Sequence, residues 1–232
     1  MIRWATLFLL ATAGPLVAEE PRVRIVTLGD SITRGVRSGV KADETFAALL
    51  EEGLRKKKIE VDVTNVGIGG ERTDQALNRL AKGVLSLKPQ VAVVMYGTND
   101  SFVDRGQKDS RLTAEQYGEN LRKLVAELRK AGVRPVLMTP PCWGKKAGPV
   151  GTGEHPNVRL EKYVRICRTV AHETKTPLVD HYERWSRRLA EGSDPGDWTT
   201  DQCHPNPRGH REIADALLPV IVEVLGKEKS ER

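Results

Sequence analysis

Short apolar runs alternate with longer amphipathic segments along this chain. The short runs are rich in β-branched residues, which indicates strands, and they cover residues 23–28, 61–66, 91–95, 133–139 and 177–180. Apolar residues recur at helical spacing between these runs, which predicts helices over 43–57, 73–87, 113–131 and 157–173 and from Asn206 towards the C-terminus. Such alternation predicts an α/β fold. We expect a three-layer α/β/α sandwich with a five-stranded parallel sheet in the flavodoxin-like order 2-1-3-4-5.

The residues with catalytic potential stand where predicted strands end. Ser31 follows the first run, a glycine cluster at 67–70 follows the second, and Asn99 follows the third. Because the carboxyl ends of parallel strands meet at one edge of a sheet, these segments are expected to lie together. Asp201 and His204 precede the last predicted helix, and their spacing lets the carboxylate reach Nδ1 while Nε2 faces the serine. The pattern predicts a nucleophilic serine at this edge, with its base and oxyanion donors.

Composition indicates one ordinary domain. The chain has 232 residues and a formal net charge of +6, and it contains no internal repeat. The densest basic cluster, at 55–58, closes a predicted helix, where cations interact favourably with the helix dipole. No basic stripe is interleaved with aromatic residues, so we do not expect a nucleic-acid partner. We expect a single domain over residues 19–232, and the sequence leaves its oligomeric state open.

The first eighteen residues differ from the rest of the chain. Arg3 precedes an apolar run over 4–13, followed by Gly14-Pro15 and a small-residue end at Ala18. This order is typical of a secretory signal peptide that is cleaved after Ala18 or nearby. The alternative, an uncleaved membrane anchor, calls for a longer uninterrupted run of about 20 residues. We expect residues 1–18 to be a signal peptide and the protein to be exported to the periplasm or the medium, without stable membrane insertion.

The three cysteines, Cys142, Cys167 and Cys203, fit no metal-binding spacing. Cys142 and Cys203 fall in segments expected near the same sheet edge, so they are the pair that could form a disulfide in an oxidising compartment. Cys167 falls within a helical pattern and is expected to be a buried free thiol.

The sequence resembles the SGNH hydrolases, the esterase and lipase superfamily also called GDSL. Four motif blocks occur in the family's order: Gly29-Asp30-Ser31-Ile32-Thr33, Asn65-Val66-Gly67-Ile68-Gly69-Gly70, Gly97-Thr98-Asn99-Asp100 and Asp201-Gln202-Cys203-His204-Pro205. The resemblance spans most of the chain, from about Arg24 through the final helix. It implies a serine esterase with Ser31, Asp201 and His204 as its catalytic triad, working through an acyl-enzyme.

The same resemblance implies an oxyanion hole. Its donors would be the backbone N–H groups of Ser31 and Gly70 and the side-chain amide of Asn99, with Gly69 as the alternative to Gly70. No metal ion and no organic cofactor are implied. The expected partner is a small-molecule or polysaccharide ester.

The substrate is less well defined by the sequence. Relatives in the superfamily include carbohydrate O-acetylesterases, lysophospholipases, arylesterases and thioesterases. The segments 142–156 and 185–198 are polar and contain tryptophans that could stack on sugar rings, which favours an acetyl group on a carbohydrate. One alternative is a lipid-directed acyl hydrolase of the lysophospholipase or thioesterase type. Another is a non-catalytic carbohydrate-binding relative, which the joint presence of the triad and Asn99 disfavours.

Other polar residues have structural interpretations. Asp30 and Asp100 are expected to tie loop N–H groups together, and Asn65 to stabilise a turn. His210 lies six positions after His204, a spacing that suits a metal site poorly. The remaining histidines are expected at the surface or in the core, although the one that follows a predicted strand could approach the site; they are His155, His172 and His181.

Overall fold

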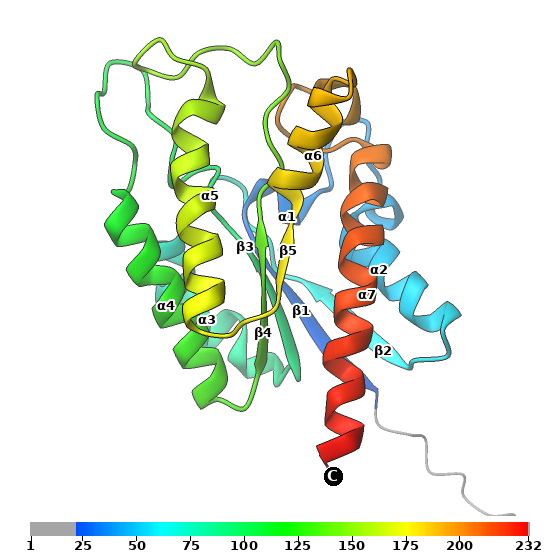
Figure 1. The fold of residues 1–232 in the computed structure, drawn as a ribbon. Coiled ribbons are helices and arrows are strands. Elements are labelled where there is room, and N and C mark those ends of the chain that lie inside the picture. The colour runs from blue at the N-terminus through cyan, green and yellow to red at the C-terminus, as the bar shows by residue number, and fades with distance from the viewer. Residues whose placement is uncertain (1–21, 232) are drawn as a thin grey trace, which may run out of the picture.

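The computed structural model describes residues 22–231, so the predicted signal peptide at 1–18 lies outside the described residues. A five-stranded sheet forms the centre, with all neighbouring strands parallel and in the order β2-β1-β3-β4-β5 (Figure 1). The strands are β1 (Val23–Gly29), β2 (Val61–Asn65), β3 (Val91–Met95), β4 (Arg134–Thr139) and β5 (Leu178–Asp180). The predicted order and pairing are confirmed.

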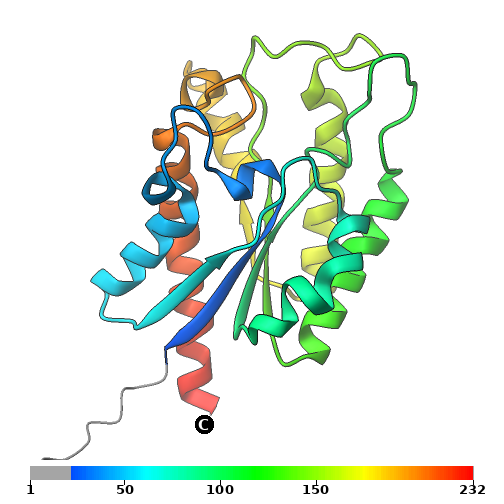
Figure 2. The same ribbon diagram turned by 180° about the vertical axis from the view of Figure 1, so that it is seen from behind.

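Helices cover both faces of the sheet, as Figures 1 and 2 show from opposite sides. One layer consists of α3 (Thr73–Gly83), α4 (Ala114–Lys130) and α5 (Pro156–Glu173). The other layer consists of α2 (Phe46–Lys56) and α7 (Pro207–Glu231), with α6 (His181–Ala190) beyond the end of β5. Within residues 22–231, no helix is sufficiently long and apolar to cross a membrane.

The central strand β3 shows why its sequence has no polar residue. Val91, Val93 and Met95 pack into the core cluster beneath α2 and α7, whereas Ala92 and Val94 pack into the cluster beneath α3, α4 and α5. Successive side chains of a strand point to opposite faces, so a strand covered by helices on both faces is apolar throughout. All five side chains are buried, which places the two layers of core on either side of one strand.

Several helix boundaries differ from the predicted ones. The helix expected from residue 43 begins at Phe46, because Thr45 caps α2 by accepting a hydrogen bond from the Ala48 N–H, and residues 42–44 form a separate 3-10 turn. The helix expected over 73–87 ends at Gly83, and a second 3-10 turn, Leu85–Leu87, follows it. Helix α6 and the four-residue α1 (Ser31–Arg34) were not predicted. Helix α1 is too short to give a helical pattern, whereas α6 has apolar residues at helical spacing, Tyr182, Trp185 and Leu189, among many charged ones.

All three cysteines are buried free thiols, so the disulfide considered between Cys142 and Cys203 is not formed. Burial raises the pKa of the Cys142 thiol to about 11. The expectation for Cys167 is confirmed, since it is a buried thiol within α5. Burial raises its pKa to about 12.

Candidate active site

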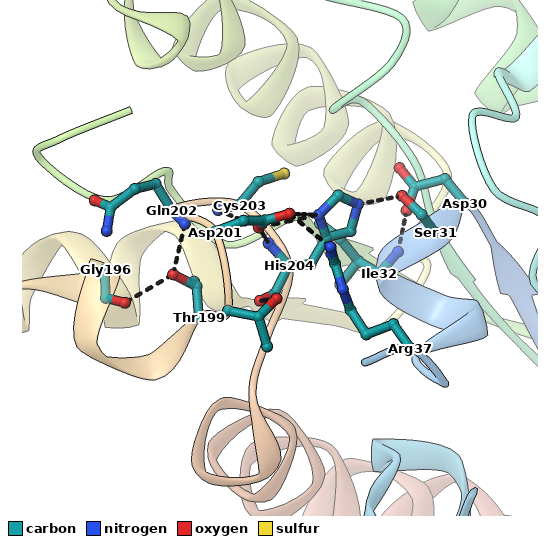
Figure 3. Close-up of polar contacts among 11 residues, drawn as sticks. Asp30, Ser31, Ile32, Arg37, Gly196, Thr199, Asp201, Gln202, Cys203 and His204 are labelled. Atoms are coloured by element: carbon teal, nitrogen blue, oxygen red, sulfur yellow. Dashed lines mark hydrogen bonds and ion pairs between the residues drawn. The ribbon is translucent and has the colours of Figure 1, made fainter. Parts of the chain in front are cut away.

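Ser31 is held at the carboxyl end of β1, where the strand turns directly into the short helix α1. Asp30 caps this helix, because its Oδ1 accepts a hydrogen bond of 2.8 Å from the Ile32 N–H. Asp30 is 1% exposed, and burial raises the pKa of its carboxyl to about 7. The cap fixes the first turn of α1 and with it the serine side chain (Figure 3).

The three predicted triad residues lie in one hydrogen-bonded line (Figure 3). Ser31 Oγ is 2.8 Å from His204 Nε2, and His204 Nδ1 is 2.8 Å from Asp201 Oδ2. A carboxylate can only accept, so Nδ1 carries the proton and the lone pair of Nε2 faces the serine hydroxyl. Asp201 Oδ1 also accepts the backbone N–H of His204 at 2.8 Å, which fixes the carboxylate on the turn that carries the base.

Electrostatics keep the imidazole neutral. Burial is the largest cause that lowers the pKa of His204 below its ordinary 6.5, Asp201 opposes it, and Arg37 and Arg34 lower it further. For Asp201 itself, burial raises the pKa, but hydrogen bonds from the backbone and the ring of His204 outweigh it and lower the pKa. A neutral imidazole beside an ionised carboxylate is the protonation state that a general base requires.

Arg37 is a site residue that the sequence did not indicate. Its Nη2 donates to Asp201 Oδ2 at 2.8 Å, across 164 positions of the chain. The side chain is 28% exposed, in the segment that follows α1. No sequence signal marks it, because Arg37 lies outside every motif block.

The turn that carries Asp201 and His204 is braced by Gln202. Gln202 has a φ of 71°, which L-residues rarely adopt. Its N–H donates to Thr199 Oγ1 at 2.9 Å, and Thr199 Oγ1 donates to the Gly196 carbonyl at 2.7 Å (Figure 3). Its carbonyl accepts the Gly144 N–H at 2.8 Å. Two loops far apart in sequence thus hold the geometry of the turn.

The residues predicted for an oxyanion hole lie on neighbouring strand ends. Asn99 follows β3, and its Nδ2 donates to Asp30 Oδ2 at 3.2 Å, next to the nucleophile. The glycine loop packs against α1, because a Cβ on Gly67 would lie 2.3 Å from the Arg34 backbone nitrogen. Gly70 has a φ of 78° in the same loop. The glycine loop therefore packs against the end of α1, and Asn99 lies against Asp30, the residue before Ser31.

Asp100 and Asn65 act as structural residues, as predicted. Asp100 is fully buried, and its Oδ1 accepts from the backbone N–H and the hydroxyl of Thr73 at 2.9 and 2.6 Å. Its Oδ2 accepts the Gly97 N–H at 3.1 Å. Asn65 donates to the Thr33 carbonyl at 2.7 Å, which joins the end of β2 to α1.

The histidines other than His204 lie in the core, at a helix cap or at the surface. His181 is fully buried with its Nε2 3.2 Å from Met138 Sδ, and burial lowers its pKa to about 3. His210 is fully buried too, and its Nδ1 accepts the Phe46 N–H at 3.2 Å. His155 caps α5, and His172 is exposed. Within the described part of the chain, no three His, Cys, Asp or Glu residues could together hold a metal ion.

The expectation that tryptophans of segment 185–198 stack on sugars is wrong. Trp185 and Trp198 are each 2% exposed and pack edge to face, with ring centroids 5.2 Å apart. Both belong to one core cluster, so little of either ring is open for stacking on a sugar. Trp143, in segment 142–156, is partly exposed and stacks on Phe102 with centroids 6.2 Å apart.

The chain is similar to known proteins along most of its length. Residues 27–212 match the GDSL-like lipase/acylhydrolase family. The lipoprotein YqeF of Bacillus subtilis (strain 168) is 28% identical over 225 residues, which cover 83% of this chain and 87% of YqeF. The isoamyl acetate-hydrolyzing esterase 1 homolog of Bos taurus is 29% identical over 226 residues, which cover 91% of this chain and 85% of that protein. The crystal structure of an acetyl xylan esterase, AlAXEase, matches with a TM-score of 0.72 at 25% identity, covering 86% of this chain and 100% of the other.

The chain therefore belongs to the GDSL-like lipase/acylhydrolase family. Its parallel five-stranded sheet with helices on both sides is the fold of its structural neighbours. It is a carboxylic ester hydrolase, in agreement with the esterase relatives found. The resemblance inferred from the four motif blocks is confirmed.

Proposed function

We propose that this protein is a serine esterase that removes short acyl groups, acetyl above all, from carbohydrate esters. The observation that carries the proposal is the line from Ser31 Oγ through His204 to Asp201, with both hydrogen bonds at 2.8 Å. Three groups in these roles are those that nucleophilic acyl transfer needs.

The mechanism follows from the protonation states. His204 Nε2 accepts the proton of the Ser31 hydroxyl as the oxygen attacks the ester carbonyl, and Asp201 stabilises the imidazolium that forms. The imidazolium returns this proton to the leaving alcohol, which leaves an acyl-serine. Water, deprotonated by His204, then attacks the acyl-serine, and the acid leaves as Ser31 regains its proton.

The tetrahedral oxyanion needs donors on the opposite side of the serine from the base. We assign this role to the backbone N–H groups of Ser31 and Gly70 and to the free N–H of Asn99. The side-chain amide of Asn99 has two N–H groups and donates one of them to Asp30, so the other is available for the oxyanion. Removal of one such donor typically lowers turnover about 100- to 1000-fold.

The choice of an acetyl ester rests on the relatives. The names of two of them, the isoamyl acetate-hydrolyzing esterase homolog and the acetyl xylan esterase, specify esters of acetic acid. The partly exposed ring of Trp143 offers an apolar face that suits a sugar.

Export, by a signal peptide at residues 1–18, is part of the proposal and is supported by the N-terminal pattern and by a relative named as a lipoprotein. N-terminal sequencing of the mature protein tests it.

Hydrolysis of p-nitrophenyl acetate, butyrate and octanoate by residues 19–232 tests the activity. Turnover should be highest on acetate, should reach background in Ser31→Ala, and should be unchanged in Ser38→Ala, which alters an exposed serine of the following loop. Acetate release from acetylated xylan is then expected. A preference for octanoate would point to a lipid ester instead. Equal inertness of wild type and Ser31→Ala, both folded, would refute the enzymatic proposal.

A further inference from the structure

The Asn99 side chain is held at both ends. Its Nδ2 donates to Asp30 Oδ2 at 3.2 Å, and its Oδ1 accepts from Arg111 Nη1 at 3.1 Å. Arg111 lies twelve residues further along the chain, outside every motif block. It is therefore an addition to the site that the four blocks do not contain.

Arg111 is itself fixed by three groups besides Asn99. Its Nε donates to Asp104 Oδ2 at 2.9 Å and its Nη2 to Asp104 Oδ1 at 2.6 Å, which is a two-pronged pairing that sets the plane of the guanidinium. The guanidinium carbon lies 4.9 Å from the centre of the Phe102 ring. The Arg111 backbone N–H donates to the Phe102 carbonyl at 2.9 Å, which folds the loop back on itself. The arginine thus reaches Asn99 from a rigid position.

These contacts select one of two amide orientations. A half-turn of the Asn99 amide would bring its N–H groups against the Arg111 guanidinium, so that donors would face donors. The same half-turn would bring its oxygen against the carboxyl of Asp30. In the observed orientation Asn99 donates one N–H to Asp30, the residue before Ser31, and keeps its other N–H for an oxyanion.

Asp30 alone does not enforce this orientation. Burial raises the pKa of Asp30 to about 7, and the nearby carboxyls of Asp100 and Glu71 raise it as well. When Asp30 is protonated, its carboxyl can donate to an amide oxygen as easily as it can accept from an amide N–H. Arg111 has only donors in either case, so it holds the amide oxygen at all working pH values.

We propose that Arg111 is the positioning residue of the oxyanion hole, which orients the Asn99 amide so that its free N–H points at the developing oxyanion. The cation also polarises the amide carbonyl, which strengthens the N–H as a donor. This assignment rests on the esterase activity proposed above. It adds a positioning residue that the motif blocks lack.

The kinetic test is Arg111→Met, with Arg122→Met as the matched control. Arg122 makes a similar ion pair with Glu173 on the surface of α4 and α5, away from the sheet edge. On p-nitrophenyl acetate, Arg111→Met should lower kcat about 10- to 100-fold with KM within about twofold, because orientation is needed in the transition state. Arg122→Met should leave both unchanged. An Arg111→Met enzyme with wild-type kcat would overturn the proposal.

A double-mutant cycle separates positioning from general damage. In an Asn99→Ala background there is no amide to orient. Adding Arg111→Met should therefore lower kcat by less than about a further twofold. Arg111→Lys, which keeps the cation but loses the two-pronged pairing with Asp104, should lie between wild type and Arg111→Met. If the factors by which Arg111→Met and Asn99→Ala each lower kcat multiply in the double mutant, Arg111 acts on something other than Asn99.

A spectroscopic measurement does not depend on activity. In ¹⁵N-labelled protein, the side-chain amide protons of Asn99 should give a dispersed pair that moves to exposed-amide positions in Arg111→Met and stays in Arg122→Met. No change in Arg111→Met would refute the positioning role even if the esterase activity is absent. Inactive wild-type enzyme with the expected change would refute the esterase proposal and leave the orientation of Asn99 by Arg111 intact.

Discussion

Arg37 and His204 donate to the same oxygen of the Asp201 carboxylate. The Arg37 Nη2 and the His204 Nδ1 each lie 2.8 Å from Asp201 Oδ2. The guanidinium places a permanent positive charge behind the acid of the triad, where it weakens the hold of Asp201 on an imidazolium. It therefore opposes protonation of the base before the substrate arrives.

Removal of this charge should shift the pH dependence of catalysis. Arg37 lowers the pKa of His204, so Arg37→Met should raise that pKa, and the acid limb of kcat/KM should move to higher pH. The pH profile on p-nitrophenyl acetate measures the shift. Arg37→Lys, which keeps a cation, should show a smaller shift. An acid limb at or below the wild-type position in Arg37→Met would contradict this role.

The bracing of the Asp201–His204 turn predicts a position-specific effect of alanine. A Cβ on Gly144 would lie 2.3 Å from Gln202 Oε1 and 2.5 Å from the Gly196 Cα, and the backbone cannot move as a side chain can. Gly144→Ala should cost about 1–3 kcal/mol of unfolding free energy and lower kcat, because the turn that carries the base must shift. Urea unfolding and kinetics measure the two effects.

The control for this substitution lies in the same loop. A Cβ on Gly148 would meet no atom within 4 Å, so Gly148→Ala should leave stability and kcat unchanged. Equal behaviour of the two variants would show that the contacts of Gly144 with Gln202 do not support the turn.

The buried tryptophan pair predicts a loss of stability without a loss of substrate affinity. Trp185→Ala should lower the free energy of unfolding by about 3–5 kcal/mol and leave KM for acetylated xylooligosaccharides unchanged in the folded protein. Trp143→Ala should do the reverse, with a raised KM and a small change in stability, because its ring is partly exposed. A raised KM in Trp185→Ala alone would revive the original interpretation of segment 185–198.

Buried His210 predicts a pH-dependent contribution to stability. Burial lowers its pKa in the folded protein from 6.5 to about 4, so between these values the unfolded chain binds a proton that the folded chain does not. Its contribution is present above pH 6.5 and is lost as the pH falls towards 4. The stability gap between wild type and His210→Gln should shrink by about 1.4 kcal/mol per pH unit in this window.

Chemical unfolding at several pH values measures this gap. His172→Gln, at an exposed position of α5, provides the matched control. A gap between wild type and His210→Gln that is constant from pH 7 to pH 4 would contradict the linkage.

The strand order and the residues of the proposed triad could both be predicted because their signals are local. Each apolar run identifies its own strand, as the unbroken run of β3 does, and parallel pairing places all carboxyl ends on one edge. Ser31 and His204 stand in short motifs of fixed spacing, so their meeting follows from the fold. Helix α6 was not predicted although Tyr182, Trp185 and Leu189 recur at helical spacing, because these few apolar residues stand among charged ones in a stretch interpreted as polar.

The sequence by itself determined the class of fold, and it predicted the edge of the sheet that carries the site and the residues proposed as nucleophile, base and acid. Only the tertiary structure decided which charged groups surround them, namely Arg37 on Asp201 and Arg111 on Asn99. It also decided that Trp185 is buried and that the cysteines remain unpaired. The physical reason is range: hydrophobic periodicity and motif spacing are properties of neighbouring residues, whereas an ion pair across 164 positions exists only once two distant loops have packed together.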